Sequence, residues 1–209
     1  MRVLIGCEFS GRGRDAFSRM GHDAWSNDII VSHAGGKHLK MCIFNAIHNH
    51  GPWDFIGLHP PCTALAVSGN RWYGKDMPLN EKRIEAIEWT TNLWKIASGS
   101  SRFCYLENPV GVLPIKANQW IQPWEFGHGE TKKTGLILNN LPPLKPTNVV
   151  EGRENRVWKM PPSEDRPMLR SLTYQGVADA MAFQWTLSIA SSFRLPDPLA
   201  PMPPPSTLP

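Results

Sequence analysis

Short apolar runs alternate with polar, glycine-containing segments along most of the chain. The runs with the length and composition of buried strands are 2–6, 22–28, 53–58, 103–106 and 134–138. Amphipathic patterns and helix start and stop residues predict helices at 14–20, 39–50, 80–98 and 173–190. Strands that alternate with helices in this way favour an α/β fold, with a mostly parallel sheet and helices on both faces.

Two polar loops and a proline-rich end interrupt this pattern. The segment 63–79 is a long polar loop, and 140–167 is a loop excursion rich in proline and charge. Residues 196–209 contain seven prolines, a composition that predicts a disordered or polyproline tail. The 209 residues therefore predict one domain over 1–195, followed by this tail.

The composition is typical of a soluble globular protein, with 41% hydrophobic and 19% charged residues. No run reaches the roughly 18 apolar residues of a membrane span, and the apolar start is too short for a secretory signal. The sequence therefore indicates a cytoplasmic protein whose four cysteines are free thiols. No Cys/His spacing matches a zinc site, so no metal is expected. The formal net charge of +4 permits a polyanionic partner.

A glycine loop follows the first predicted strand. Its residues are Phe9, Ser10, Gly11, Arg12 and Gly13. Because glycine has no Cβ, the backbone at both glycines can approach a bound nucleotide cofactor closely. Asp28 ends the second strand, which is where an acid holds ribose hydroxyls in such sites. The alternative is that Asp28 is an ordinary turn or helix-capping aspartate.

Polar residues stiffened by proline follow two further strands. His59-Pro60-Pro61-Cys62-Thr63 comes after the strand at 53–58, and Glu107-Asn108-Pro109 comes after the strand at 103–106. The two prolines end regular strand pairing, because neither can donate a hydrogen bond. The carboxyl ends of parallel strands meet at one edge of a sheet, so the two segments are expected side by side. Cys62 is then either a nucleophile on a rigid loop or a buried structural cysteine.

These segments, in this order, resemble the motifs of the DNA (cytosine-5)-methyltransferase family. The resemblance covers about residues 1–139, and 177–185 is similar to the family's C-terminal helical motif. It implies a Rossmann-like class I S-adenosylmethionine-dependent methyltransferase fold and a single catalytic domain. The small size is similar to that of phage and prophage members without a large target-recognition domain, which implies the host cytoplasm as location.

The resemblance also implies roles for individual residues. Cys62 would be the nucleophile that attacks carbon 6 of cytosine, and Glu107, held by Asn108, would orient the base. The glycine loop, Asp28 and Pro60 would bind S-adenosylmethionine. The residues expected at the substrate are Pro61, Thr63, Pro109, Arg71, Lys132 and Lys133.

In that set, one of the two lysines would supply a cation near the cytosine carbonyl, unless both are solvated. Arg71 lies in the loop 63–79, whose basic residues would neutralise phosphates. Leu58-His59 replaces the family's usual glycine before Pro-Pro-Cys, and Thr63 replaces its glutamine.

The predicted reaction is methylation of carbon 5 of cytosine in DNA, with the base flipped out of the duplex. Two alternatives stay open. One is the same chemistry on a free cytosine nucleotide or on RNA, and the other is a catalytically weak protein that binds DNA or cofactor. The sequence predicts neither the target sequence nor the oligomeric state, and it does not identify the base that removes the carbon 5 proton.

Overall fold

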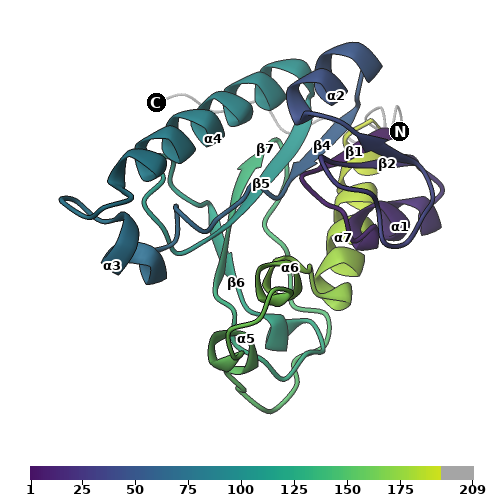
Figure 1. The fold of residues 1–209 in the computed structure, drawn as a ribbon. Helices are drawn as coiled ribbons and strands as arrows, with labels where there is room; N and C mark the ends of the chain where they lie inside the picture. Colours follow the sequence, from purple (N-terminus) through teal and green to yellow (C-terminus); the bar gives the residue numbers. More distant parts are fainter. Residues whose placement is uncertain (194–209) are drawn as a thin grey trace, which may run out of the picture.

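The computed structural model describes residues 1–193, which form a seven-stranded sheet between two layers of helices (Figure 1). The strands are β1 (Arg2–Gly6), β2 (Asp23–Asp28), β3 (His38–Lys40), β4 (Phe55–Leu58), β5 (Phe103–Pro109), β6 (Gln119–Ile121) and β7 (Thr134–Asn139). Their order across the sheet is β3-β2-β1-β4-β5-β7-β6. The proline-rich tail predicted at 196–209 lies outside the described residues.

The first five strands are parallel, and the last two strands form an antiparallel extension at one edge. β1 pairs in parallel with both β2 and β4, while β7 runs antiparallel to β5 and to β6. This arrangement confirms the predicted α/β fold with a mostly parallel sheet and is compatible with a Rossmann-like fold. The order reverses between β1 and β4, and ligands bind at such a reversal, beyond the carboxyl ends of the strands.

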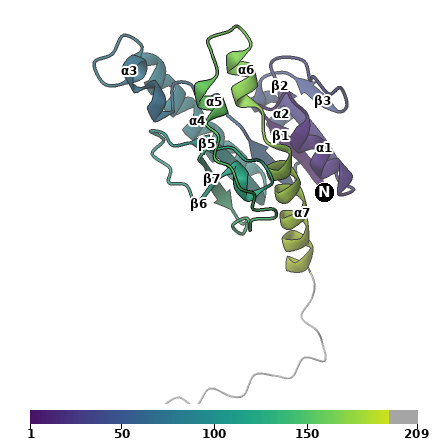
Figure 2. The ribbon, with the colours of Figure 1, turned by 90° about the horizontal axis from the view of Figure 1, so that it is seen from below.

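Helices cover both faces of the sheet. The helices are α1 (Arg12–Arg19), α2 (Ile43–His50), α3 (Asn70–Tyr73), α4 (Asn80–Ser100), α5 (Arg156–Lys159), α6 (Arg166–Ser171) and α7 (Gln175–Ser192). The helices α2 and α4 pack on one face, and α1 and α7 pack side by side on the other (Figures 1 and 2). The short helices α5 and α6 lie beyond the sheet, on the side of β6 and α7.

Side chains alternate between two apolar layers along the central strands. Ile5, Phe55 and Tyr105 belong to the layer under α1 and α7, whereas Leu4 and Ile56 belong to the layer under α2 and α4. All five are at most 1% exposed. Because successive strand residues point to opposite faces, the polar residues that follow these strands are divided between the faces in the same way.

Two predicted helices begin at other residues in the structure than the sequence pattern indicates. The first part of the predicted helix 39–50 is an extended segment, because His38–Lys40 adds to the sheet beside β2, and the helix begins at Ile43. Asn80 is not the N-cap of α4 but its first residue, and Leu79 holds the cap position. The Asn80 amide instead donates to the carbonyls of Tyr73 and Gly74.

The largest difference concerns β5. Glu107-Asn108-Pro109 was expected beyond the strand, but these residues are its last three and pair with β7. Pro109 is tolerated there because it ends the strand. β7 begins at Thr134 as expected, and the short strand β6 was not predicted.

The predicted loop 140–167 runs against the segment 122–130. Parallel bridges join Phe126 to Asn148 and Glu130 to Glu154. Trp185 of α7 also donates to the carbonyl of Pro142 at 2.9 Å. The excursion is therefore attached to the body at several points, and it contains the short helix α5. Among the described residues, no helix is long and apolar enough to cross a membrane.

Candidate active site

The glycine loop between β1 and α1 is folded around the buried side chain of Glu8. One carboxylate oxygen, Oε1, accepts hydrogen bonds from the Ser10 hydroxyl and from the backbone N–H of Arg12, the latter at 2.9 Å. The other oxygen, Oε2, is buried and has no hydrogen-bond partner within residues 1–193. A buried carboxylate with a free oxygen is costly unless a ligand completes its hydrogen bonds.

The two glycines of the loop have different roles. Gly11 precedes α1 with a φ of 76°, a left-handed conformation that favours glycine. Gly13 is instead inside α1, where a Cβ would lie 3.2 Å from the Ile5 side chain. Gly13 therefore allows close packing of helix on strand and does not line the loop as expected. Arg12 also points away, because its guanidinium donates to the carbonyl of Thr173 at 2.6 Å.

Asp28 ends β2 beside the glycine loop, as predicted, and is half-buried. The next residues form an exposed apolar run, with Ile29 73% and Val31 61% exposed. Cys7 lies close enough for Asp28 to affect it: burial, followed by the Asp28 charge, raises the pKa of this thiol to about 12. A carboxylate and an apolar run therefore border the carboxyl ends of β1 and β2.

The Cys62 loop begins at the end of β4, where the backbone N–H of His59 donates to the carbonyl of Gly6 at 3.0 Å. Pro60 is buried, Pro61 and Thr63 are exposed, and Cys62 is half-buried between them. The Cys62 carbonyl accepts from the N–H groups of residues 65 and 66, at 3.0 and 2.9 Å. Cys62 therefore lies at a tight turn on the loop.

Two neighbouring elements hold the residues after Cys62. Arg83 of α4 is buried and donates to the carbonyls of Ala64 and Ala66, at 2.7 and 3.2 Å. On the other side, Leu65 accepts from Val112 at 3.0 Å. This pairing needs glycine at 111, because a Cβ there would lie 2.5 Å from the Leu65 carbonyl oxygen.

Glu107 lies near the end of β5 with a side chain that is 20% exposed. His59 Nδ1 is 3.4 Å from Glu107 Oε2. Burial alone raises the pKa of Glu107, but His59 and the positive charge of Lys132 outweigh burial and hold the pKa below its ordinary value. The Glu107 carboxylate is therefore ionised at neutral pH.

The charges around Cys62 oppose one another. Burial raises the pKa of the thiol, and the negative charge of Glu107 raises it further. Lys132 and Arg170 lower the pKa but do not restore its ordinary value. Cys62 is therefore a protonated thiol at neutral pH, and nucleophilic attack requires that its proton first be removed.

A pocket that opens to solvent lies beside Glu107. Its polar lining comes from His59, Glu107, Lys132, Thr134, Thr173 and Tyr174. Lys132 lies in this lining and donates to the carbonyl of Arg170 at 3.1 Å. Lys133 points elsewhere, since its ammonium group lies 5.1 Å from the centre of the Trp120 ring. Of the two candidate lysines, only Lys132 lies near Glu107.

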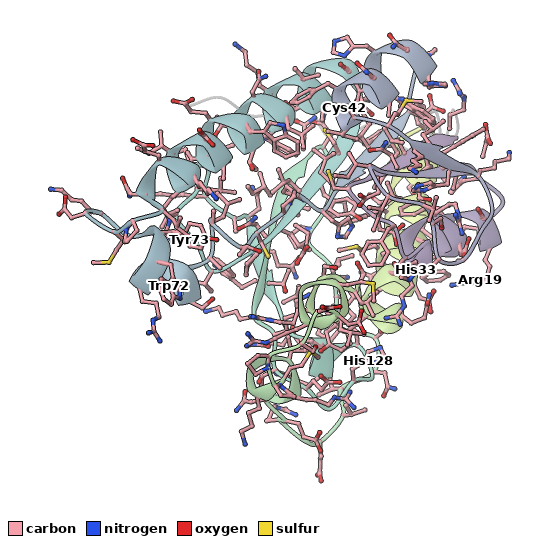
Figure 3. The ribbon with its side chains drawn as sticks, in the orientation of Figure 1. Arg19, His33, Cys42, Trp72, Tyr73 and His128 are labelled. Carbon is pink, nitrogen blue, oxygen red and sulfur yellow. The ribbon has the colours of Figure 1, made fainter. Side chains whose placement is uncertain are left out.

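Three expected site residues lie away from this pocket. Asn108 is buried on the opposite face of the sheet, and neither side-chain atom of its amide has a partner among the described residues. Pro109 is the last residue of β5 and lines the same opposite pocket. Arg71 is exposed on α3, 4.9 Å from the ring of Trp72. Figure 3 shows Trp72 at the outer edge of the molecule.

The structure adds residues that the motifs did not indicate. Glu8, His59 and Arg170 each interact with an expected site residue. For Glu8 a signal was available, because an acid directly after a buried apolar strand needs a specific partner. His59 was visible only as a departure from the family pattern, and nothing in the sequence related Arg170 to Cys62.

Comparison with known proteins does not assign the chain to a family. No protein-family model matches the sequence, and no curated protein matches it. The functional assignment therefore depends on the residues at the carboxyl ends of β1, β2, β4 and β5, together with Lys132 before β7. These bring together a thiol, an ionised carboxylate and a lysine beside a glycine loop.

Proposed function

We propose that the protein is an S-adenosylmethionine-dependent methyltransferase that methylates carbon 5 of cytosine in DNA. The main observation that supports this proposal is that Cys62 and Glu107 lie near each other. They follow or end the neighbouring parallel strands β4 and β5, and the Glu107 charge acts on the Cys62 thiol. The glycine loop follows β1, the strand on the other side of β4. A methyl donor and a cytosine could therefore be held at one sheet edge.

The residues around the glycine loop fit S-adenosylmethionine, which supplies the methyl group when bound. The unpaired Oε2 of Glu8 suits its positively charged amino-acid end. Asp28 can accept hydrogen bonds from its ribose, and the exposed apolar run at 29–31 suits its adenine ring. The resemblance assigns Pro60 to the cofactor side, and Pro60 is buried at the start of the Cys62 loop.

Cys62 would act through its thiolate. Carbon 5 of cytosine is a weak nucleophile, but a bond from Cys62 Sγ to carbon 6 makes carbon 5 electron-rich. After carbon 5 takes the methyl group, its proton leaves to a base, and the bond between Sγ and carbon 6 breaks. Lys132 and Arg170 favour the thiolate, which opposes the effect of burial.

Glu107 and Lys132 would hold the base. An ionised carboxylate accepts a hydrogen bond from the exocyclic amine and so orients the base. Attack by the thiolate brings negative charge into the ring, so a positive group is needed on the side of the carbonyl. Lys132 lines the same pocket and suits the cytosine carbonyl. Pro61 and Thr63 flank Cys62 and are exposed to the substrate.

A duplex DNA substrate sets a further requirement on the position of the base. A cytosine within a duplex cannot reach Cys62, so it must be flipped out. Arg71 and Lys133 lie outside the pocket, where they suit phosphate contacts. In the part of the chain that the structure describes, few residues are left to read neighbouring bases, so the recognition sequence is expected to be short or loose.

Covalent trapping tests the proposed chemistry. Duplex DNA with 5-fluorocytosine should form a stable adduct with the protein in the presence of S-adenosylmethionine, because fluorine at carbon 5 cannot leave as a proton does. Cys62→Ala should abolish the adduct, while Cys42→Ala, which removes an exposed cysteine, should leave it unchanged. An active preparation that forms no adduct would exclude the Cys62 mechanism.

Transfer of labelled methyl groups identifies the substrate. Label from S-adenosylmethionine should pass to duplex DNA. Label found only on dCMP or only on RNA would replace DNA with that substrate. DNA binding without transfer to any of them would instead identify a binding protein. Bisulfite sequencing of DNA from cells that express the protein would then give the sequence context.

A further inference from the structure

His59 lies between the buried Tyr105 and the half-buried Glu107 of β5. Its side chain is 8% exposed, its Nδ1 lies 3.4 Å from Glu107 Oε2, and its Nε2 lies 2.8 Å from the Tyr105 hydroxyl. The His59 and Tyr105 rings are perpendicular, with centres 5.5 Å apart. The histidine therefore joins the end of β4 to two successive inward-facing residues of β5.

The partners of its two ring nitrogens favour one tautomer of His59. Tyr105 is 1% exposed, and burial raises its pKa well above the ordinary value, so the hydroxyl keeps its proton. His59 is the only hydrogen-bond partner of this hydroxyl among the described residues. If Tyr105 donates to Nε2, a neutral imidazole carries its proton on Nδ1, the nitrogen that faces Glu107.

We infer that His59 is a positioning residue for Glu107. Its Nδ1–H holds Oε2 of the carboxylate on the protein side, which leaves Oε1 to accept a hydrogen bond from the substrate base. Tyr105 fixes the histidine, and Gly57 makes room for the tyrosine, since a Cβ there would lie 2.4 Å from the Tyr105 ring. This inference rests on the proposed function for the role of the base, but not for the effect of His59 on Glu107.

Other charged groups face the same pair and are part of the argument. Lys132 acts on Glu107 from the segment before β7, and Cys62 follows His59 on its own loop. Glu8 acts on Tyr105 from the glycine loop, and Tyr174 lines the pocket before α7. Lys132 supplies positive charge but is held by the Arg170 carbonyl. Thr134 also lowers the pKa of Glu107 through its hydroxyl, but this hydroxyl donates to the Lys132 carbonyl at 2.9 Å. His59 differs from both because a second contact, between its Nε2 and Tyr105, fixes the direction of its ring.

The test measures Glu107 directly. The pKa of its carboxyl group is followed by carbon-13 NMR, with Glu107→Gln to assign the signal. His59→Leu removes the donor, so the pKa should rise by about one unit. His59→Asn keeps an N–H near the place of Nδ1 and should leave the pKa within a few tenths of wild type. Tyr105→Phe removes the hydroxyl that fixes the tautomer of His59. The Glu107 pKa in this variant should therefore lie between the values in wild type and in His59→Leu.

Kinetics give a second measurement on the same variants. In His59→Leu, kcat should fall about tenfold, and the acid limb of its pH profile should move to higher pH, because Glu107 is then protonated more easily. In His59→Asn, kcat should stay within about threefold of wild type.

An unchanged Glu107 pKa in folded His59→Leu would overturn the inference, as would equal losses in the Leu and Asn variants. If His59→Leu does not fold, the comparison of Tyr105→Phe with His59→Asn decides: equal Glu107 pKa values in these two and in wild type overturn the inference. If the wild type transfers no methyl group, the proposed function fails, while the NMR measurement still decides the role of His59.

Discussion

Alternation along β5 and β7 separates residues that are neighbours in the sequence. Glu107 and Thr134 line one pocket, whereas Asn108 and Gly135 line another pocket on the opposite face of the sheet. A side chain and its successor point to opposite faces of a strand. The tripeptide Glu-Asn-Pro therefore does not act as one unit: Glu107 lies with Cys62, and Asn108 lies on the other face of the sheet.

The opposing charges around Cys62 predict how its reactivity changes with pH. Glu107→Gln removes a negative charge and should lower the thiol pKa, so that iodoacetamide modifies Cys62 at lower pH than in wild type. Lys132→Met removes a positive charge and should move the profile to higher pH. Mass spectrometry of the Cys62 peptide measures both shifts. Identical profiles in the two variants would show that these charges do not act on the thiol.

The free oxygen of Glu8 predicts a contribution to cofactor binding. Glu8→Gln keeps the shape of the side chain but removes its charge, so the Kd for S-adenosylmethionine should rise about 10- to 100-fold. Isothermal titration measures this without any methyl transfer. Glu85→Gln, an exposed acid on α4, is the control and should bind as wild type does. An unchanged Kd in Glu8→Gln would place the cationic end of the cofactor elsewhere.

At the level of elements, the Cys62 loop depends on α4 and on the segment after β5. Arg83 donates to the Ala64 and Ala66 carbonyls and to the Asn70 side chain. The segment after β5 adds a β-bridge between Ala66 and Gly111. Residues 63–70 are therefore held from two sides, although the sequence predicts only a long loop there.

Replacement of Arg83 should release this loop. Arg83→Met keeps an apolar stem but removes the donor to the partly buried Ala64 carbonyl and one of the two donors to the Ala66 carbonyl, which keeps the N–H of Gly69. The free energy of unfolding should fall by about 1 to 3 kcal/mol. Trypsin should also cut faster after Arg71 and Lys75. Urea unfolding and limited proteolysis measure the two effects. Lys82→Met, an exposed neighbour, is the control, and equal cleavage in both variants would contradict the role of Arg83.

The sequence predicts those helices and strands whose formation depends on residues within the element itself. The strands β1, β2 and β4 and the helix α4 follow from apolar runs and helix start and stop residues within each segment. The strand β3 and the final residues of β5 do not, because they become strands only by pairing with β2 and β7. Such pairing depends on residues far away in the sequence.

At the level of the whole molecule, the site lies where the sheet order reverses. The reversal between β1 and β4 separates the glycine loop from the Cys62 loop, so two ligands can meet there. α3 lies on one side of the molecule, and α5 and α6 lie on another (Figure 1). Within residues 1–193, these short helices and their loops are what is available around the site, which is why a short recognition sequence is expected.

The buried thiol of Cys104 makes the free energy of unfolding depend on pH in the alkaline range. Cys104 is fully buried, and burial raises its pKa to about 11. The unfolded chain loses this proton from about pH 9, while the folded protein keeps it until about pH 11. The free energy of unfolding should therefore fall with rising pH in this range, by up to about 1.4 kcal/mol per unit for this thiol.

Urea unfolding at pH 8, 9, 10 and 11 measures this slope. Cys104→Ala should reduce the slope, whatever it does to stability at pH 8. Cys42→Ala removes an exposed cysteine and should leave the slope near the wild-type value. Equal slopes in all three proteins would show that Cys104 does not keep its proton in the folded state.

The sequence by itself determined the strand-to-helix alternation, the glycine loop, and the positions of Cys62 and Glu107 at strand ends. These follow from apolar periodicity, proline and glycine, which act over a few residues. Only the tertiary structure decided which of two adjacent lysines faces Glu107, that Asn108 lies on the other face of the sheet, and that His59 contacts Glu107. Those outcomes depend on strand register and on packing between distant segments, which no local pattern contains.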